Sequence, residues 1–74
     1  MKEAVKYYKE AARFGFRLAQ FDLAICYLNG DGVKQNFEKA IRSLEKAAAQ
    51  DLDEAENVLQ KLREDPELAV YFTE

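Results

Sequence analysis

The sequence contains no histidine, a single cysteine and a single proline. One cysteine rules out a disulfide within the chain, and without histidine it cannot complete a zinc site, which takes about four such ligands. The sequence also has no glycine-rich phosphate loop and no serine placed beside a base, so the groups that an active site needs are missing. We therefore expect no enzymatic activity, no cofactor and no bound metal.

Long apolar runs are missing as well. The longest extends from Leu23 to Leu28, far short of the roughly 20 residues that span a bilayer. No apolar stretch behind a basic start marks a signal peptide. We therefore expect no membrane insertion and, because no disulfide can form, a location in the cytoplasm.

Charge is distributed unevenly along the chain. The net charge of −3 argues against a nucleic-acid partner. Residues 1–17 carry +3, residues 18–50 are neutral and residues 51–74 carry −6. Two interpretations remain open: an ordinary solvated surface with an acidic end, or an electrostatically polar rod that stacks or docks in one direction.

Apolar residues recur at helical spacing, and nothing alternates with a period of two. Gly15 and the Asn-Gly-Asp-Gly stretch at 29–32 interrupt this pattern, because glycine adopts the backbone conformations that end helices. The sequence thus predicts an all-α protein. The expected helices lie near residues 2–14, 17–28, 37–50, 53–63 and 66–72.

Three helix starts have recognisable signals. Asn36 is a good N-cap for the third helix, because its side-chain oxygen can accept hydrogen bonds from free amides. The fourth helix is expected to start near Asp51 with a variant of the capping box that uses Glu54. Asp65 followed by Pro66 predicts the start of a short terminal helix.

The sequence also resembles itself when it is shifted by 36 residues. The matching pairs are Ala4 and Ala40, Val5 and Ile41, Lys6 and Arg42, Ala11 and Ala47, Ala12 and Ala48, Phe16 and Leu52, Ala19 and Ala55, and Leu23 and Leu59. A fixed period of this length is typical of a solenoid. The alternative is a chance similarity between amphipathic helices.

The segment 23–33, Leu-Ala-Ile-Cys-Tyr-Leu-Asn-Gly-Asp-Gly-Val, resembles the Sel-one-like repeat, a relative of the tetratricopeptide repeat. That family has the pattern Leu-Gly-x-x-Tyr-x-x-Gly-x-Gly-Val, followed by Lys-Ala and Lys-Ala-Ala. The resemblance covers about residues 2–62. The residues that match the repeat pattern are Leu23, Tyr27, Gly30, Gly32, Ala40, Ala47 and Ala48.

Three positions depart from the family pattern. Ala24 replaces a glycine, Ser43 replaces an aromatic residue, and Asp51 replaces the closing glycine, so that the corner there is expected to be built differently. The tetratricopeptide repeat itself is the nearest rival. Its period of about 34 residues fits less well.

The resemblance implies a right-handed helix-turn-helix solenoid, an alpha-alpha superhelix in which residues 1–74 form a single repeat domain. Its parts would be the second helix of one repeat at 2–15, a full repeat at 16–51, the first helix of another at 52–63, and a C-terminal capping helix at 65–74. Because solenoids generally need about three repeats, we expect either the C-terminal part of a longer array or a homo-oligomer.

The resemblance also implies a non-catalytic scaffold or adaptor that binds a protein or peptide. The alternative is a purely structural segment that only stacks or self-associates. A second apolar stripe on the helix near 17–28 is the candidate partner groove, although a neighbouring or terminal helix could cover it instead. The groove residues are Leu18, Phe21, Asp22, Ile25 and Leu28, whereas one period later Glu54, Asn57, Lys61 and Glu64 are all polar.

Two remaining patterns are interpreted without a functional role. Cys26 lies within an apolar helix and is interpreted as a small core residue rather than a reactive thiol. Asn29 and Asp31, with the two glycines beside them, resemble a calcium-binding loop, but the twelfth position is Ala40 and not an acidic residue.

Overall fold

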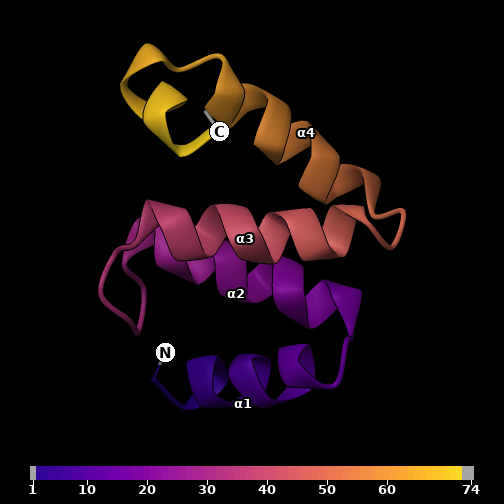
Figure 1. Cartoon of the computed structure of the whole chain (residues 1–74). Coiled ribbons are helices and arrows are strands. Elements are labelled where there is room, and N and C mark those ends of the chain that lie inside the picture. Colours follow the sequence, from indigo (N-terminus) through magenta and orange to yellow (C-terminus); the bar gives the residue numbers. More distant parts are fainter. Residues whose placement is uncertain (1, 73–74) are drawn as a thin grey trace.

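The computed structural model of the chain describes residues 2–72, which form a stack of helices without any β-strand (Figure 1). The elements are α1 (Lys2–Arg13), α2 (Arg17–Asn29), α3 (Phe37–Ala48), α4 (Asp53–Arg63) and the 3₁₀-helix η1 (Pro66–Phe72). The prediction of an all-α protein is therefore confirmed. Helices α1 and α3 end one and two residues earlier than expected, because the chain already turns at those positions.

The helices follow one another through the stack in the order of the sequence. Helix α2 packs against α1 on one side and α3 on the other, and α4 packs against α3. The terminal η1 packs on α4 and, to a smaller extent, on α3. Figure 1 shows α1 and η1 at opposite ends of the stack, as expected of a solenoid in which each element contacts its neighbours.

The main core lies between α2, α3 and α4. It consists of Ala24, Ala40, Ile41, Leu44, Ala47, Leu52, Ala55 and Leu59. Leu44 and Leu59 are its largest fully buried side chains, and the alanines, including Ala24 and Ala40 at 0% exposure, allow the helix backbones to approach closely. Large residues thus fill the space between helices and small residues lie where helices touch.

A second, smaller core joins α1 to α2. Val5, Leu23 and Cys26 are its buried members, and the partly buried Tyr8 and Tyr27 pack against them. Between the same two helices, the buried side chain of Gln20 donates a hydrogen bond to the Ala12 carbonyl (3.4 Å). Its own oxygen accepts one from the side-chain amide of Gln50 (3.0 Å), so the polar atoms inside this corner are paired.

The two corners that follow α1 and α3 have the same backbone geometry, 36 residues apart. The amide of Phe16 donates to the Ala11 carbonyl and the amide of Leu52 donates to the Ala47 carbonyl, each at 3.3 Å. The residue before each donor is left-handed, with φ 89° at Gly15 and 66° at Asp51. Both corners are Schellman motifs. The expectation that Asp51 changes the corner was therefore wrong, because aspartate tolerates this conformation.

The loop between α2 and α3 folds back over the end of α2. Gly30 and Gly32 have φ values of 67° and 76°, as expected for Gly32 from the sequence. The Gln35 side chain donates to the Leu28 carbonyl at 2.8 Å, and the Asn36 amide donates to the Tyr27 carbonyl at 3.0 Å. These bonds satisfy carbonyls that the end of α2 leaves without a helical partner.

Replacing Gly32 by valine is expected to lower the free energy of unfolding by about 1–2 kcal/mol, because a β-branched side chain is strained at positive φ. Urea denaturation would measure the loss. Gly32→Asn is the matched control and should cost less, since asparagine visits this region more readily. Equal stability of the valine variant and the parent would show that the loop does not require glycine there.

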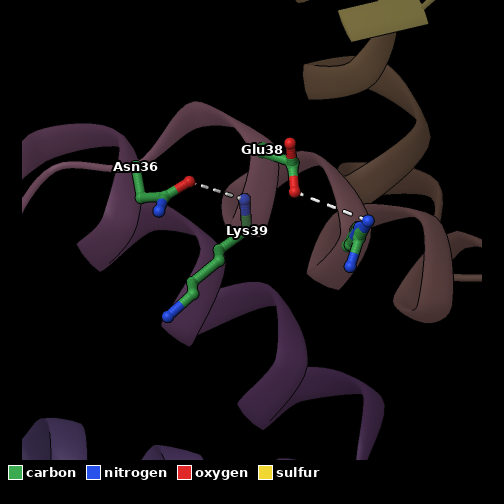
Figure 2. A network of polar contacts seen from close by, with 4 residues as sticks. Asn36, Glu38 and Lys39 are labelled. Carbon is green, nitrogen blue, oxygen red and sulfur yellow. Dashed lines mark hydrogen bonds and ion pairs between the residues drawn. The ribbon is translucent and has the colours of Figure 1, made fainter.

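The start of α3 is capped as the sequence predicts. The backbone amide of Lys39 donates to Oδ1 of Asn36 at 3.0 Å, and Glu38 pairs with Arg42 at 3.4 Å one turn further on (Figure 2). The terminal helix is capped in a related way, since the amide of Glu67 donates to Oδ1 of Asp65 at 2.9 Å. Both N-cap predictions are confirmed.

The predicted bounds of α4, 53–63, are confirmed, but the predicted cap at its start was wrong. The N-cap residue is Leu52, which offers no side-chain hydrogen bond, and the helix begins at Asp53. Asp51 is occupied by the left-handed corner and stands one residue too early to cap the helix. The capping box with Glu54 does not form.

Candidate protein-interaction surface

The second apolar stripe of α2 lies on the side of the helix that faces away from Leu23 and Tyr27. At about 100° per residue, positions 21 and 25 are roughly opposite positions 23 and 27. Leu18 is 62% exposed, and the other predicted groove residues are half-buried. The stripe is therefore accessible along the helix.

An open hollow of about 290 Å³ lies beside this stripe, between α1, α2 and the start of the following loop. Its lining residues are Tyr8, Phe21, Asp22, Ile25, Cys26, Asn29 and Asp31. The structure thus brings together three of the five predicted groove residues, Phe21, Asp22 and Ile25, around one concave surface. We call this surface the α2 hollow.

The four apolar groove residues differ in their packing. Phe21 and Leu28 pack against the main core, so part of their apolar surface is already used within the fold. Leu18 and Ile25 belong to neither core cluster. Leu18 and Ile25 are therefore the apolar residues of the stripe whose exposure the fold leaves unexplained.

The terminal helix packs mainly on α4 and α3. The Tyr71 ring lies 6.3 Å from that of Phe37, and the Arg63 guanidinium lies 5.3 Å from the ring centre of Phe72. Figure 1 shows η1 at the top of the stack, beside the end of α4 and on the other side of α3 from α1. This placement leaves the α2 hollow open.

The sequence did not single out Tyr8, Asn29 and Asp31 as lining residues. Tyr8 is half-buried, packs against the smaller core and also lines the hollow. Asn29 and Asp31 belong to the loop signal and reach the hollow only because the loop folds back. The apolar character of Tyr8, at the margin of the packing face of its helix, was the one sequence signal that could have identified a lining residue.

Cys26 lies at the base of the hollow with 6% of its surface exposed and forms no disulfide. Burial, followed by the nearby negative charges of Asp31 and Asp22, raises the pKa of its thiol above 9.0. The thiol is therefore neutral near pH 7, which agrees with its interpretation as a core residue.

We expect Cys26 to react with a thiol reagent at least about tenfold more slowly in the folded chain than in denaturant, because only the thiolate attacks. The raised pKa favours the folded state below the unfolded value of 9.0, and this contribution is lost as the pH rises through the folded value. Stability should therefore fall more steeply above pH 9.0 in the parent than in Cys26→Ala. Equal reaction rates in the two states would contradict the burial of this thiol.

The polar character predicted for the equivalent positions of α4 agrees with their exposure. Glu54, Asn57, Lys61 and Glu64 are all exposed. The apolar stripe is thus confined to α2. Among residues 2–72, no group of three acidic or cysteine side chains could hold a metal ion, and no helix is long and apolar enough to cross a membrane.

Antiparallel helices stacked with a 36-residue period, and with the same Schellman corner after α1 and after α3, define an α-solenoid of helical hairpins. Residues 1–15 and 17–52 match the Sel1 repeat. The chain belongs to the Sel1 repeat family, whose repeats generally mediate contacts between proteins.

One curated relative is the DAP3-binding cell death enhancer 1 of Rattus norvegicus. It is 38% identical over 61 residues, which are 82% of this chain and 12% of the relative. The chain therefore spans only a small part of the length of that protein. No solved structure matches the chain.

Proposed function

We propose that the chain is a non-catalytic protein-binding module that holds a segment of a partner protein in the α2 hollow. One observation carries the proposal: Ile25 lines a hollow that the fold leaves open, and both Ile25 and Leu18, two turns earlier on the same stripe, belong to neither core cluster. A contiguous apolar surface of this kind on a folded chain is typical of an interaction site.

The charges of the hollow define the chemistry of the segment. Asp22 and Asp31 lie on its edge beside the apolar side chains of Phe21 and Ile25. A partner segment with an apolar residue next to a lysine or arginine would fill the hollow and meet these carboxylates. The apolar contact would supply affinity, and the charge pairs would orient the segment.

The rat relative is named for binding DAP3. DAP3 is therefore the first defined partner to test against this chain. The adaptor role would follow if the chain holds such a partner while its end faces remain free for other contacts.

A photo-crosslinking amino acid at position 18 or 25 would test the proposal in cells. We expect crosslinks to a defined protein from both positions, because Ile25 lines the hollow and Leu18 is exposed two turns earlier on the same apolar stripe. Lys61 occupies the place of Ile25 one period later and is the matched control, from which the same protein should not crosslink. Equal crosslinking from all three positions, or none from positions 18 and 25, would overturn the proposal.

A second candidate is a structural segment that associates with another copy of itself. Leu52 is 8% exposed, whereas its equivalent Phe16 is 63% exposed, and Tyr7 and Phe14 on the same end of the stack are 68% and 74% exposed. A further helix against this end would bury these aromatic rings. We propose that a second copy supplies it in solution.

Sedimentation over a range of concentrations would separate the two candidates. Self-association through α1 should weaken in Phe16→Ser and should be unchanged in Ile25→Glu, whereas partner binding should respond in the opposite way. A chain that stays monomeric at every concentration would exclude the second candidate.

A further inference from the structure

Positive charge gathers on the other side of the stack, over α1, α3 and the loop before α3. Three neighbouring hollows there share Lys9 as a lining residue. Six of the eleven lysines and arginines of the chain line these hollows, against one acidic residue, Glu10. The six are Lys6, Lys9, Arg13, Lys34, Lys39 and Lys46.

The central of these hollows, here called the basic hollow, has a volume of about 270 Å³. Its charged rim consists of Lys9 and Arg13 from α1 and Lys46 from α3. Ala12, Leu23 and Tyr27 form an apolar base, and Gln20 and Ser43 complete the lining. One site therefore combines a cationic rim with an apolar base.

Ser43 explains why this space is open. The equivalent residue one period earlier is Tyr7, whose large ring contrasts with the small hydroxymethyl group of serine. Ser43 itself is half-buried and lines the hollow. A small side chain at this point of α3 leaves room for an apolar group from outside.

The cations around the hollow are not neutralised within the fold. The ion pairs found among residues 2–72 join Arg42 to Glu38 and Arg63 to Glu56, and none involves the six basic residues. Lys39 lies 5.7 Å from the ring centre of Tyr27 and has no carboxylate partner. Like charges thus accumulate here without compensation, which favours an anionic ligand.

The basic hollow is separate from the α2 hollow. The α2 residues at its base, Leu23 and Tyr27, lie on the opposite side of that helix from Phe21 and Ile25. Different residues line the two surfaces. One can therefore be altered without changing the other.

We propose that the basic hollow binds an acidic peptide segment of a partner protein, with one apolar side chain of that segment inserted among Ala12, Leu23 and Tyr27. The carboxylates of the segment would meet Lys9, Arg13 and Lys46. Nucleic acid fits less well, because it has no aliphatic side chain for the base of the hollow and would meet a chain of net charge −3.

Three fluorescent probes test this proposal on the whole chain: a peptide of nine glutamates, the same peptide with leucine at its centre, and a ten-nucleotide oligothymidylate. We expect the leucine peptide to bind about tenfold more tightly than the glutamate peptide, because it buries an apolar side chain. Binding of both peptides should weaken as salt is raised. Failure of the leucine peptide to bind, no difference between the two peptides, or tighter binding of the oligonucleotide would overturn the proposal.

Two variants locate the contact. Lys46→Glu should weaken binding of the leucine peptide at least tenfold, whereas Lys61→Glu, the same charge change on α4, should alter it less than twofold. Ser43→Phe should fill the hollow and reduce the leucine peptide to the affinity of the glutamate peptide. Circular dichroism would verify that each variant is folded. Unchanged binding in folded Lys46→Glu and Ser43→Phe chains would exclude this site.

Discussion

Replacement of Leu44 by alanine is expected to lower the free energy of unfolding by about 2–5 kcal/mol. Leu44 is 0% exposed and lies in the middle of the main core, where α3 contacts α2 and α4. The truncation removes buried apolar surface and leaves a cavity that close-packed helices can only partly collapse. Since small domains have a total stability of about 5–15 kcal/mol, a large part of it would be lost.

Urea denaturation followed by circular dichroism would measure this loss as a lower midpoint at similar slope. Leu18→Ala is the control. It removes the same atoms from a side chain that is 62% exposed, so the expected change is within about 0.5 kcal/mol. Equal effects of the two substitutions would mean that α3 is not the centre of the fold.

Local signals explain why the helices and loops were predictable from sequence. The amide oxygen of Asn36, the glycines of the α2–α3 loop and the Asp65-Pro66 pair each act on neighbouring backbone groups, so the residue type alone indicates the structure. The Asp51 corner was missed because its residue type gives no such local signal. Its left-handed conformation is supported by backbone hydrogen bonds to the end of α3, and an aspartate side chain does not by itself predict that conformation.

The candidate site was predictable only in part. Helical spacing identified a second apolar face on α2, but it could not separate Phe21 and Leu28, which pack against the main core, from Leu18 and Ile25, which do not. That distinction depends on where the neighbouring helices lie. Spacing gives the direction of a side chain on its own helix and does not say what that direction meets.

Summing the charges over segments of the sequence did not predict the basic hollow. Residues 18–50 are neutral in sum, yet Lys39 and Lys46 lie near α1 while Glu38 and Glu45 line a hollow against the terminal helix. These two lysines therefore lie on a different face of α3 from the two glutamates, which share their hollow with Arg42. Examining charge by helical face would have shown this separation, because each pair is spaced by seven residues, close to two turns.

Replacing Ala40 by leucine is expected to cost about 1–3 kcal/mol, because overpacking a filled core forces side chains from their preferred rotamers or moves the backbone. Ala40 is 0% exposed and, with Ala24, belongs to the main core. The extra atoms have no space between the helices. A stable Ala40→Leu variant would show that the interface is looser than this packing implies.

Ala4 is the matched control, since it occupies the place of Ala40 one period earlier on α1 and is only half-buried. Ala4→Leu should change stability by less than about 0.5 kcal/mol, because the added side chain can extend into solvent. Both unfolding midpoints should be measured at low and at high protein concentration. If a second copy packs on α1, Ala4→Leu becomes destabilising only at high concentration. A cost that is large and independent of concentration would mean that Ala4 is already packed within a single chain, contrary to its exposure.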